Sequence, residues 1–253
     1  MSTINYEQRD HVAWMTMNRP EVLNALSKSM FRALEHGIQI AAQDREVFSL
    51  VIKGSSKAFS AGLDIREAAS FGSRKETRDF VYKYVKPFWQ AFLRCDKPIL
   101  SIVEGAAYGA GAEIALASDI VIASTNSVFG FTGGRVGALC CISGLLGPLT
   151  MNGRKVSEMN LTGETISAQQ ALYYGLVNQV TSANEQAALT SKILDQIAHV
   201  SPISNSSFKR IERSMITDQS LETSYKELLR AMTSEDFKKG AKSFLEKSIA
   251  RYY

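Results

Sequence analysis

The sequence has few cysteines, no long apolar run and no cluster of basic residues. Its three cysteines are odd in number and two of them are adjacent, which argues against a disulfide framework or the spacing of a metal site. No apolar run reaches the ~18 residues that a membrane-spanning helix needs, and residues 1–5 lack the regions of a signal peptide. We therefore expect a cytoplasmic protein without a metal site or a membrane partner.

Charge is spread along the chain. Lys and Arg total 29 and Asp and Glu total 25, which gives a net charge of +4 without a run of five basic residues. This balance argues against a nucleic-acid partner. The 253 residues, 45% of them hydrophobic, suit a globular protein with one main core, alone or with a smaller helical appendage. We find no internal repeat and no low-complexity segment.

Strand and helix patterns alternate in the first part of the chain. Short apolar segments at residues 12–17, 49–53, 99–103 and 120–123 predict strands. Between the first two, Ser27 is expected to cap a helix over residues 28–43, in which apolar residues recur with a period of 3.6. This alternation predicts parallel pairing of the strands. After residue 183 the pattern predicts four helices, over residues 185–200, 202–215, 221–232 and 234–249.

Two glycine-containing turns carry the chemistry. The first, residues 58–65, follows a predicted strand, and Gly62 lets the backbone adopt a conformation that presents the Leu63 N–H inward. The second, residues 108–113, opens an apolar helix whose first N–H groups favour an anion near Ala110. Two such N–H groups aimed at one oxygen stabilise a developing enolate or another oxyanion. Taken alone, the first stretch is more typical of a tight turn that buries Phe59, Leu63 and Ile65.

Glu113 lies in the first turn of the predicted helix over residues 112–117. A glutamate in this position often does no more than complement the helix dipole. The neighbours of Glu113 are all small or apolar, which predicts burial and the raised pKa that a general base needs. The sequence therefore predicts an oxyanion trap with a carboxylate beside it.

Five phrases occur in a characteristic order, and together they resemble one family. They cover residues 18–26, 59–65, 97–99, 105–120 and 161–177. In this order they closely resemble the crotonase superfamily, the enoyl-CoA hydratase/isomerase group, with a weaker resemblance over residues 234–247. The resemblance implies an α/β fold, a spiral of ββα repeats with two roughly perpendicular sheets. It also implies a core over residues 1–183 and a helical trimerisation region over residues 184–253, in a homotrimer or hexamer.

The resemblance also implies a substrate and a site. The substrate is an acyl-CoA thioester, with coenzyme A as part of the substrate and no separate cofactor. The thioester oxygen is expected to bind the backbone N–H groups of Leu63 and Ala110, with Glu113 as the third catalytic residue. The backbone around Ala61 is expected against the adenine. The remaining substrate-binding residues implied by the motifs are Leu23, Ala25, Ser60, Gly62, Asp64, Ile65, Gly109, Thr132 and Gly133.

The sequence departs from the hydratase pattern at Gly133. Hydratases of this family carry a second glutamate in a Phe-Gly-x-Pro-Glu phrase, and here the corresponding residues 129–133 read Phe-Gly-Phe-Thr-Gly. Adding water across a double bond requires one group for the water and one for the α-carbon proton. Moving a double bond requires only one base that takes a proton and returns it elsewhere. The sequence therefore predicts enoyl-CoA isomerisation with Glu113 as the single acid/base.

Other activities stay open at this point. They are an enoyl-CoA hydratase with an atypical second acid, an acyl-CoA hydrolase or decarboxylase, and a non-catalytic acyl-CoA-binding subunit. Residues 132–137 also resemble dihydroxynaphthoyl-CoA synthases, in which the glycine leaves room for a bicarbonate base. Those enzymes carry an acidic residue where this chain has Cys140 and Cys141, and they lack the glutamate found here as Glu113. Ring closure is therefore disfavoured.

Several further residues are candidates for a role in the site. Cys140 and Cys141 lie in an apolar stretch and are expected to be buried, inert thiols. Tyr108 is placed either at the cleft or in the core, and Arg135 either on the surface or beside a substrate carboxylate. The three histidines, His11, His36 and His199, lie outside the motifs and are expected on the surface or in packing.

Overall fold

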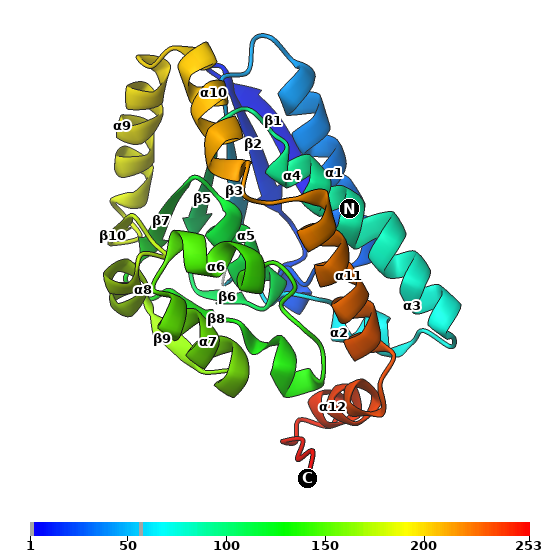
Figure 1. The fold of residues 1–253 in the computed structure, drawn as a ribbon. Helices are drawn as coiled ribbons and strands as arrows, with labels where there is room; N and C mark the ends of the chain where they lie inside the picture. The colour runs from blue at the N-terminus through cyan, green and yellow to red at the C-terminus, as the bar shows by residue number, and fades with distance from the viewer. Residues whose placement is uncertain (1–2, 56–57) are drawn as a thin grey trace.

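Two β-sheets form the centre of the molecule, and helices enclose them (Figure 1). The computed structural model describes residues 3–55 and 58–253. The larger sheet has the order β1-β2-β3-β5-β7-β10. Its strands are β1 (Ile4–Arg9), β2 (Val12–Met17), β3 (Ser49–Gly54), β5 (Ile99–Val103), β7 (Ile120–Ser124) and β10 (Gln179–Thr181).

The expected parallel pairing is confirmed for the four predicted strands, and the edge strand β1, which the sequence did not predict, is antiparallel. β1 pairs antiparallel with β2, with Ile4 opposite Met17. The turn between them places Asp10 and His11 at positive φ, 46° and 65°, as a tight hairpin requires. The sequence pattern does not indicate β1, because most of its side chains face solvent.

A second sheet consists of strands with only three residues each. In the order β4-β6-β8-β9 these are β4 (Ala58–Ser60), β6 (Ala106–Tyr108), β8 (Val128–Gly130) and β9 (Thr165–Ser167). β4, β6 and β8 each follow a strand of the larger sheet after a few residues and pair in parallel, while β9 is antiparallel to β8. The chain thus passes repeatedly from one sheet to the other, and this sheet brings residues 58–65 beside residues 108–113.

The helix α1 (Lys28–Gln43) forms where the sequence predicts it. Ser27 accepts a hydrogen bond from the Met30 N–H, and the apolar face of the helix is buried against the sheet. The segment without a clear sequence pattern between residues 65 and 93 is also helical. It contains α2 (Ile65–Ala69), α3 (Arg74–Phe80), the π-helical turn η2 (Val81–Val85) and α4 (Lys86–Leu93). Asp64 and Ser73 cap the N-termini of α2 and α3. These short helices are therefore stabilised by local side-chain hydrogen bonds and show no long amphipathic pattern in the sequence.

The remaining helices of the first 183 residues surround the second sheet. They are α5 (Ala110–Ala117), α6 (Ser143–Thr150), α7 (Gly153–Thr162), α8 (Ala168–Tyr174), and the 3-10 turns η1 (Pro20–Val22) and η3 (Thr132–Val136). α5 carries a continuously buried sequence and therefore runs through the interior. Within the described residues, no helix is long and apolar enough to cross a bilayer.

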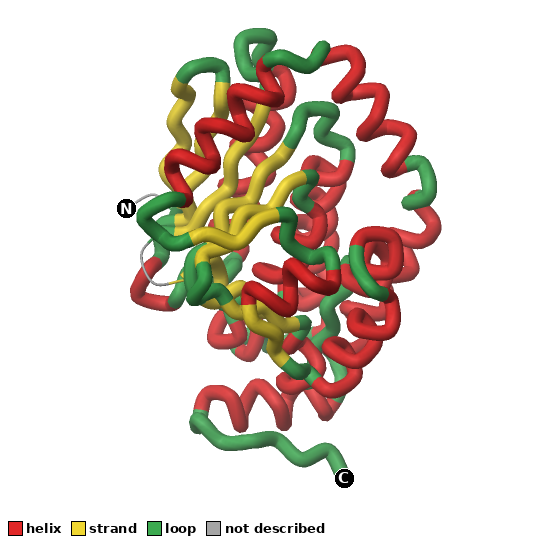
Figure 2. Tube along the Cα trace, turned by 90° about the vertical axis from the view of Figure 1, so that its left-hand side faces the viewer, coloured by secondary structure: helices red, strands yellow, loops and turns green. Residues whose placement is uncertain are grey.

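Four helices follow residue 183, as the sequence predicts. They are α9 (Gln186–Ala198), α10 (Pro202–Arg213), α11 (Asp218–Met232) and α12 (Glu235–Leu245). The last helix ends before the expected residue 249, because the backbone leaves the helical region at Lys247, where φ is +55°. α9 covers one face of the larger sheet through Ile193, while α11 and α12 join the main core on the other side. Figure 2 shows the resulting arrangement, with helices on both sides of the strands. The division at residue 183 into two domains stays a prediction.

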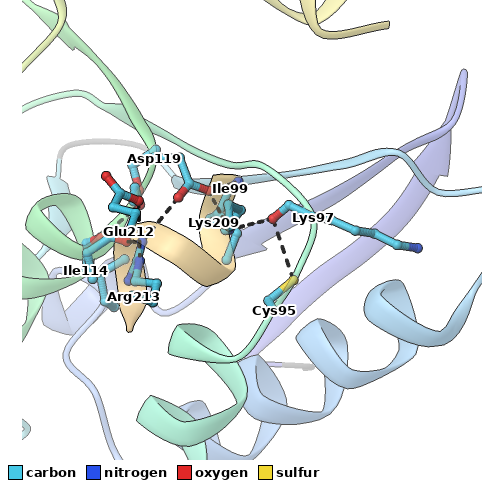
Figure 3. Close-up of polar contacts among 11 residues, drawn as sticks. Cys95, Lys97, Ile99, Ile114, Asp119, Lys209, Glu212 and Arg213 are labelled. Carbon is cyan, nitrogen blue, oxygen red and sulfur yellow. Dashed lines mark hydrogen bonds and ion pairs between the residues drawn. The ribbon is translucent and has the colours of Figure 1, made fainter. Parts of the chain in front are cut away.

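A buried ionic cluster fastens α10 to the body (Figure 3). The carboxylate of Asp119, just beyond the end of α5, lies 2.6 Å from Lys209 Nζ and 3.1 Å from Arg213 Nη2. The same carboxylate accepts the backbone N–H of Ile99 at 2.7 Å. Since Lys209 is 5% exposed, its charge depends on this partner and on the Lys97 carbonyl, to which it also donates. α10 is therefore held by paired charges.

Candidate active site

A cavity of about 320 Å³ lies beside the N-terminus of α5. Its walls include most of the residues that the sequence motifs single out. These are Leu23, Ala25, Ala61, Leu63, Asp64, Ile65, Gly109, Ala110, Glu113, Thr132 and Gly133. The segments that supply them are far apart in the chain, so the fold creates this cavity.

Two of the motif segments are interlocked by hydrogen bonds. The Ala61 N–H donates to the Leu23 carbonyl, and the Leu26 N–H donates to the Gly62 carbonyl. Behind the cavity wall, the Ser60 hydroxyl donates to the Asn24 carbonyl and accepts the Gly62 N–H. Ser60 and Gly62 are not among the residues that line the cavity, and these bonds fix the path of the turn, so their contact with a substrate stays a prediction.

Glycine allows the two turns to approach each other closely. Gly62 has φ of +83°, and a Cβ at this position would lie 2.4 Å from the Tyr108 carbonyl oxygen and 3.1 Å from Ala110 N. Gly109, with φ of +52°, precedes α5. A side chain at Gly62 would push the turns apart, so the expectation of an unusual backbone conformation there is confirmed.

The same geometry leaves two backbone donors available. Leu63 lies in an isolated parallel bridge with Leu26, but the bonds of this bridge use the Gly62 carbonyl and the Asp64 N–H. Ala110 is the first residue of α5, and the first N–H groups of a helix have no acceptor within that helix. Leu63 and Ala110 thus line one cavity, and the joint action of their N–H groups as an oxyanion hole stays a prediction.

Glu113 is buried in the first turn of α5, with 2% of its surface exposed. Its Oε1 accepts hydrogen bonds from the backbone N–H of Ile142 at 2.6 Å and of Ser143 at 2.8 Å. These two groups lie at the start of α6, so the carboxyl group of one helix is held at the N-terminus of another. This fixed orientation is what proton transfer to a bound substrate requires.

Burial raises the pKa of Glu113 to about 8, although the hydrogen bonds from Ser143 and Ile142 favour the charged form. Desolvation prevails because no cation pairs with the carboxylate within the described residues. A carboxyl group with a pKa near neutrality can both take and return a proton during turnover.

The other carboxylates at the cavity are committed elsewhere or lie at its surface. Asp64 caps α2 through the Glu67 N–H and lies 3.0 Å from Arg19 Nη1, which makes it a structural residue. Glu21 is exposed at the surface. Glu113 is therefore the carboxylate whose position and surroundings suit proton transfer.

The backbone is crowded around Gly133, the position of the missing second glutamate. A Cβ at Gly133 would lie 3.0 Å from the Leu139 carbonyl carbon and 3.1 Å from Cys140 N. Contacts this short require the backbone of residues 139–140 to move by several tenths of an ångström. Residues 139–140 therefore crowd the position from which a second acid would extend.

Comparison with known proteins agrees with these observations. Residues 7–253 match the enoyl-CoA hydratase/isomerase family. The chain belongs to this family. It is 32% identical to an (E)-benzylidenesuccinyl-CoA hydratase from Thauera aromatica, over 96% of each chain. It is 30% identical to a probable mitochondrial enoyl-CoA hydratase from Dictyostelium discoideum, over 99% of this chain and 91% of that one.

Solved structures confirm the predicted crotonase-type fold of this family member. A carnitinyl-CoA hydratase from Mycobacterium avium superposes with a TM-score of 0.86 and 28% identity, over 100% of this chain and 98% of the other. An enoyl-CoA hydratase/isomerase from Pseudoalteromonas atlantica gives the same TM-score with 26% identity, over 99% and 100%. The names of the relatives leave the choice between hydratase and isomerase open.

The far wall of the cavity in this family member comes from segments outside the five phrases, and only its Phe244 lies in the weaker resemblance over residues 234–247. Phe80, Val85 and Trp89 belong to the helices after residue 65, while Leu228 and Phe244 come from α11 and α12. The first four of these residues are buried apolar side chains on helices, and this is the only sequence signal that could have indicated them. Phe244 is half-exposed at the edge of the wall. This wall is apolar, which suits a hydrocarbon chain or ring.

The remaining candidates lie outside the reacting end of the cavity. The Arg135 side chain is exposed, and its carbonyl accepts the Tyr252 hydroxyl. The three histidines are exposed and lie outside the cavity lining. Cys140 and Cys141 are free and buried, as expected, but both contribute to the cavity wall. Within residues 3–55 and 58–253, no three His, Cys, Asp or Glu side chains gather as a metal site would require.

Proposed function

We propose that this protein isomerises 3-enoyl-CoA thioesters to 2-enoyl-CoA thioesters. The thioester oxygen binds the N–H groups of Leu63 and Ala110. Glu113 removes a proton from C2, and the electron pair moves into the thioester to give an enolate that the two N–H groups stabilise. Glu113 then returns the proton to C4, which leaves the double bond between C2 and C3.

One observation carries this proposal: a single suitable carboxylate lies at the reacting end of the cavity. Glu113 is buried and held by two backbone N–H groups, while the space beyond Gly133 is taken by residues 139–140. A reaction with one acid/base fits this arrangement, because the proton removed and the proton added can travel on the same carboxyl group. Among residues 3–55 and 58–253, we identify no second carboxylate at the reacting end that would position and activate water for hydration.

The acyl group in this proposal lies against the apolar far wall, and coenzyme A extends past Leu23, Ala25 and Ala61 toward the surface. Leu23 is the most exposed of these, and the turn that carries it is held by the bonds to Ala61 described above. Leu23 and Ala61 are therefore well placed for the nucleotide end of the substrate, and Ala25 for the pantetheine.

An assay with paired substrates tests the proposal. Purified protein is given hex-3-enoyl-CoA and, separately, hex-2-enoyl-CoA, and products are separated by chromatography. We expect conversion of the 3-enoyl ester to the 2-enoyl ester at a rate above that of hydration. Hydration of the 2-enoyl ester that outpaces isomerisation would refute the assignment.

Isotope transfer tests the role of Glu113 more sharply. With deuterium at C2 of the 3-enoyl ester, a single carboxyl carrier should deliver part of the deuterium to C4 of the product. Complete exchange with solvent at every turnover would indicate a second proton path. Glu104→Gln is the matched control, because Glu104 is exposed and lies outside this cavity.

Hydration is the second candidate, and the names of both relatives described above favour it. It would require Glu113 to activate water and to protonate C2 in turn. The paired assay separates the two reactions. A protein that binds the thioester and turns over neither substrate would instead be a binding subunit.

A further inference from the structure

The thiol of Cys140 lies in the cavity wall next to the position that Gly133 leaves without a side chain. Its Sγ is 3.2 Å from the point where a Cβ of residue 133 would be. Cys140 and Glu113 line the same cavity, and both are buried, with 5% and 2% of their surfaces exposed. A nucleophilic atom therefore occupies the region from which the second glutamate of family hydratases would extend.

The carboxyl group beside this thiol is free to accept a ligand's proton. Within residues 3–55 and 58–253, the hydrogen bonds to Glu113 reach Oε1, and no protein group binds Oε2. Glu113 thus presents an unpartnered oxygen in a buried site. Together with the oxyanion-hole geometry of Leu63 and Ala110, this creates the three elements of conjugate addition: a nucleophile, a base and an acceptor for enolate charge.

We propose that Cys140 adds reversibly to C3 of a 2-enoyl thioester bound in this cavity. Glu113 removes the thiol proton, the sulfur forms a bond to C3, and the C2–C3 π bond breaks. Its electron pair moves to the thioester oxygen as an enolate, and Glu113 delivers the proton to C2. The adduct is a thioether, and elimination in the reverse direction restores the thiol and the 2-enoyl ester.

This inference rests on the proposed function, since the product of the proposed isomerisation is itself the electrophile. The adduct would occupy the acyl site and stop turnover, so product that accumulates would inhibit the protein until elimination releases it. Burial raises the pKa of the Cys140 thiol, which keeps it protonated and harmless in the absence of a base positioned to deprotonate it. The addition therefore requires Glu113 as well as the thiol.

Cys141 supplies a matched control within the same wall. It is buried to a similar extent, but Ser224 of α11 donates to its carbonyl and its thiol contacts the same serine. The atoms nearest to a Cβ placed at Gly133 include the backbone N and Sγ of Cys140 and no atom of Cys141. The geometry thus selects one of two adjacent thiols.

Intact-mass spectrometry after incubation with but-2-enoyl-CoA and an acid quench tests the proposal. We expect the wild-type mass to rise by one molecule of the thioester, with the label mapped to Cys140 after digestion. Cys141→Ser should retain the adduct, whereas Cys140→Ser and Cys140→Ala should reduce its yield at least tenfold. Glu113→Gln should slow its formation to a similar degree.

Binding of butanoyl-CoA, which has no double bond, distinguishes the possible failures. A wild-type protein that binds butanoyl-CoA and forms no adduct overturns the cysteine proposal and leaves the isomerase assignment standing. Failure to bind butanoyl-CoA overturns both. Equal labelling of Cys140→Ala and wild type, or a label on Cys141, also refutes the proposal, and melting curves establish that each variant is folded.

Discussion

Two carboxylates at the two ends of α5 are both largely buried, but their surroundings differ. Glu113, in the first turn, receives two backbone N–H groups and no cation within the described residues. Asp119, just beyond the last turn, receives Lys209, Arg213 and the Ile99 N–H. A carboxylate paired with cations is fixed in its charged form and serves to join elements, whereas one held only by dipoles can change its protonation. One helix therefore carries a structural carboxylate and the carboxylate that we propose as the acid/base.

Glu113→Gln removes the reactive carboxyl group while keeping its shape. We expect isomerase turnover to fall by about 10²–10⁴-fold, because Gln cannot carry a proton between C2 and C4. Binding of butanoyl-CoA should persist, since the Leu63 and Ala110 donors are unchanged. Steady-state kinetics and calorimetry measure the two quantities, and Glu104→Gln serves as the control. Full turnover in the Gln variant would remove the distinction between the two carboxylates.

Asp119→Asn tests the structural member of the pair. It leaves Lys209 without a charged partner among the described residues and Arg213 with only Glu212, which is 3.7 Å away and about half-exposed. Breaking such a buried pair typically costs about 3–5 kcal/mol of unfolding free energy. Urea denaturation measures the loss. Turnover per folded molecule should change little, because Asp119 lies outside the cavity lining. A stable variant with impaired turnover would reverse the roles assigned to the two ends of α5.

The pH dependence of stability should differ between wild type and Glu113→Gln. Since the folded-state pKa of Glu113 is about 8 and its ordinary value is 4.5, the native protein holds a proton that the unfolded chain releases between these values. The unfolding free energy therefore falls by about 1.4 kcal/mol per pH unit in this window through Glu113 alone. Melting curves from pH 5 to 8, roughly the window of that shift, should show the Gln variant gaining stability relative to wild type as pH rises.

The activity should rise with pH across the same interval, because the base form of Glu113 increases as pH approaches its pKa of about 8. In kcat/KM, which reports on the free protein, we expect an inflection near that value. A profile that is flat from pH 6 to 9, about the range that brackets the pKa, would mean that the carboxyl group is already charged.

Lys209→Met removes one of the two cations that pair with Asp119, and we expect a smaller loss of unfolding free energy than for Asp119→Asn. Asp119 keeps Arg213 and the Ile99 N–H, so the carboxylate stays paired. We expect a loss of about 1.5–3 kcal/mol, the contribution of a hydrogen bond to a charged group. A loss as large as that of Asp119→Asn would show that Lys209 alone neutralises the carboxylate.

Among these variants, we expect Arg94→Ala to change the unfolding free energy least. Arg94 and Asp218 form an ion pair at 2.9 Å in which both side chains are mostly exposed. We expect a change of about 0.5 kcal/mol or less, because water screens such pairs. Denaturation under the conditions used for Asp119→Asn measures it, and a larger loss would show that this pair also holds α11.

The residues predicted from the sequence are those whose role depends on local chain geometry. Gly62, Ala110 and Glu113 belong to turns and helix starts, where the residue type itself constrains the backbone. The capped helix after Ser27 and the four helices after residue 183 were predictable for the same reason. The strands of the second sheet were not, because three residues give no periodicity to detect.

The far wall and the Asp119 cluster depend on contacts between distant parts of the chain. Trp89 and Phe244 are separated by much of the sequence and line one cavity only because α12 folds back over it. Asp119 lies in the phrase over residues 105–120 but Lys209 lies in none, and their pairing follows from where α10 lies on the body. The sequence signals the chemistry through its turns, while the shape of the acyl pocket arises from tertiary packing.

The crowding around Gly133 has a consequence for restoring the missing glutamate. A glutamate introduced there must displace the backbone at Leu139 and the thiol of Cys140 before it can reach the substrate. Gly133→Glu alone is therefore expected to strain the chain around residues 139–140, and a second carboxylate at this position calls for a compensating change in that segment.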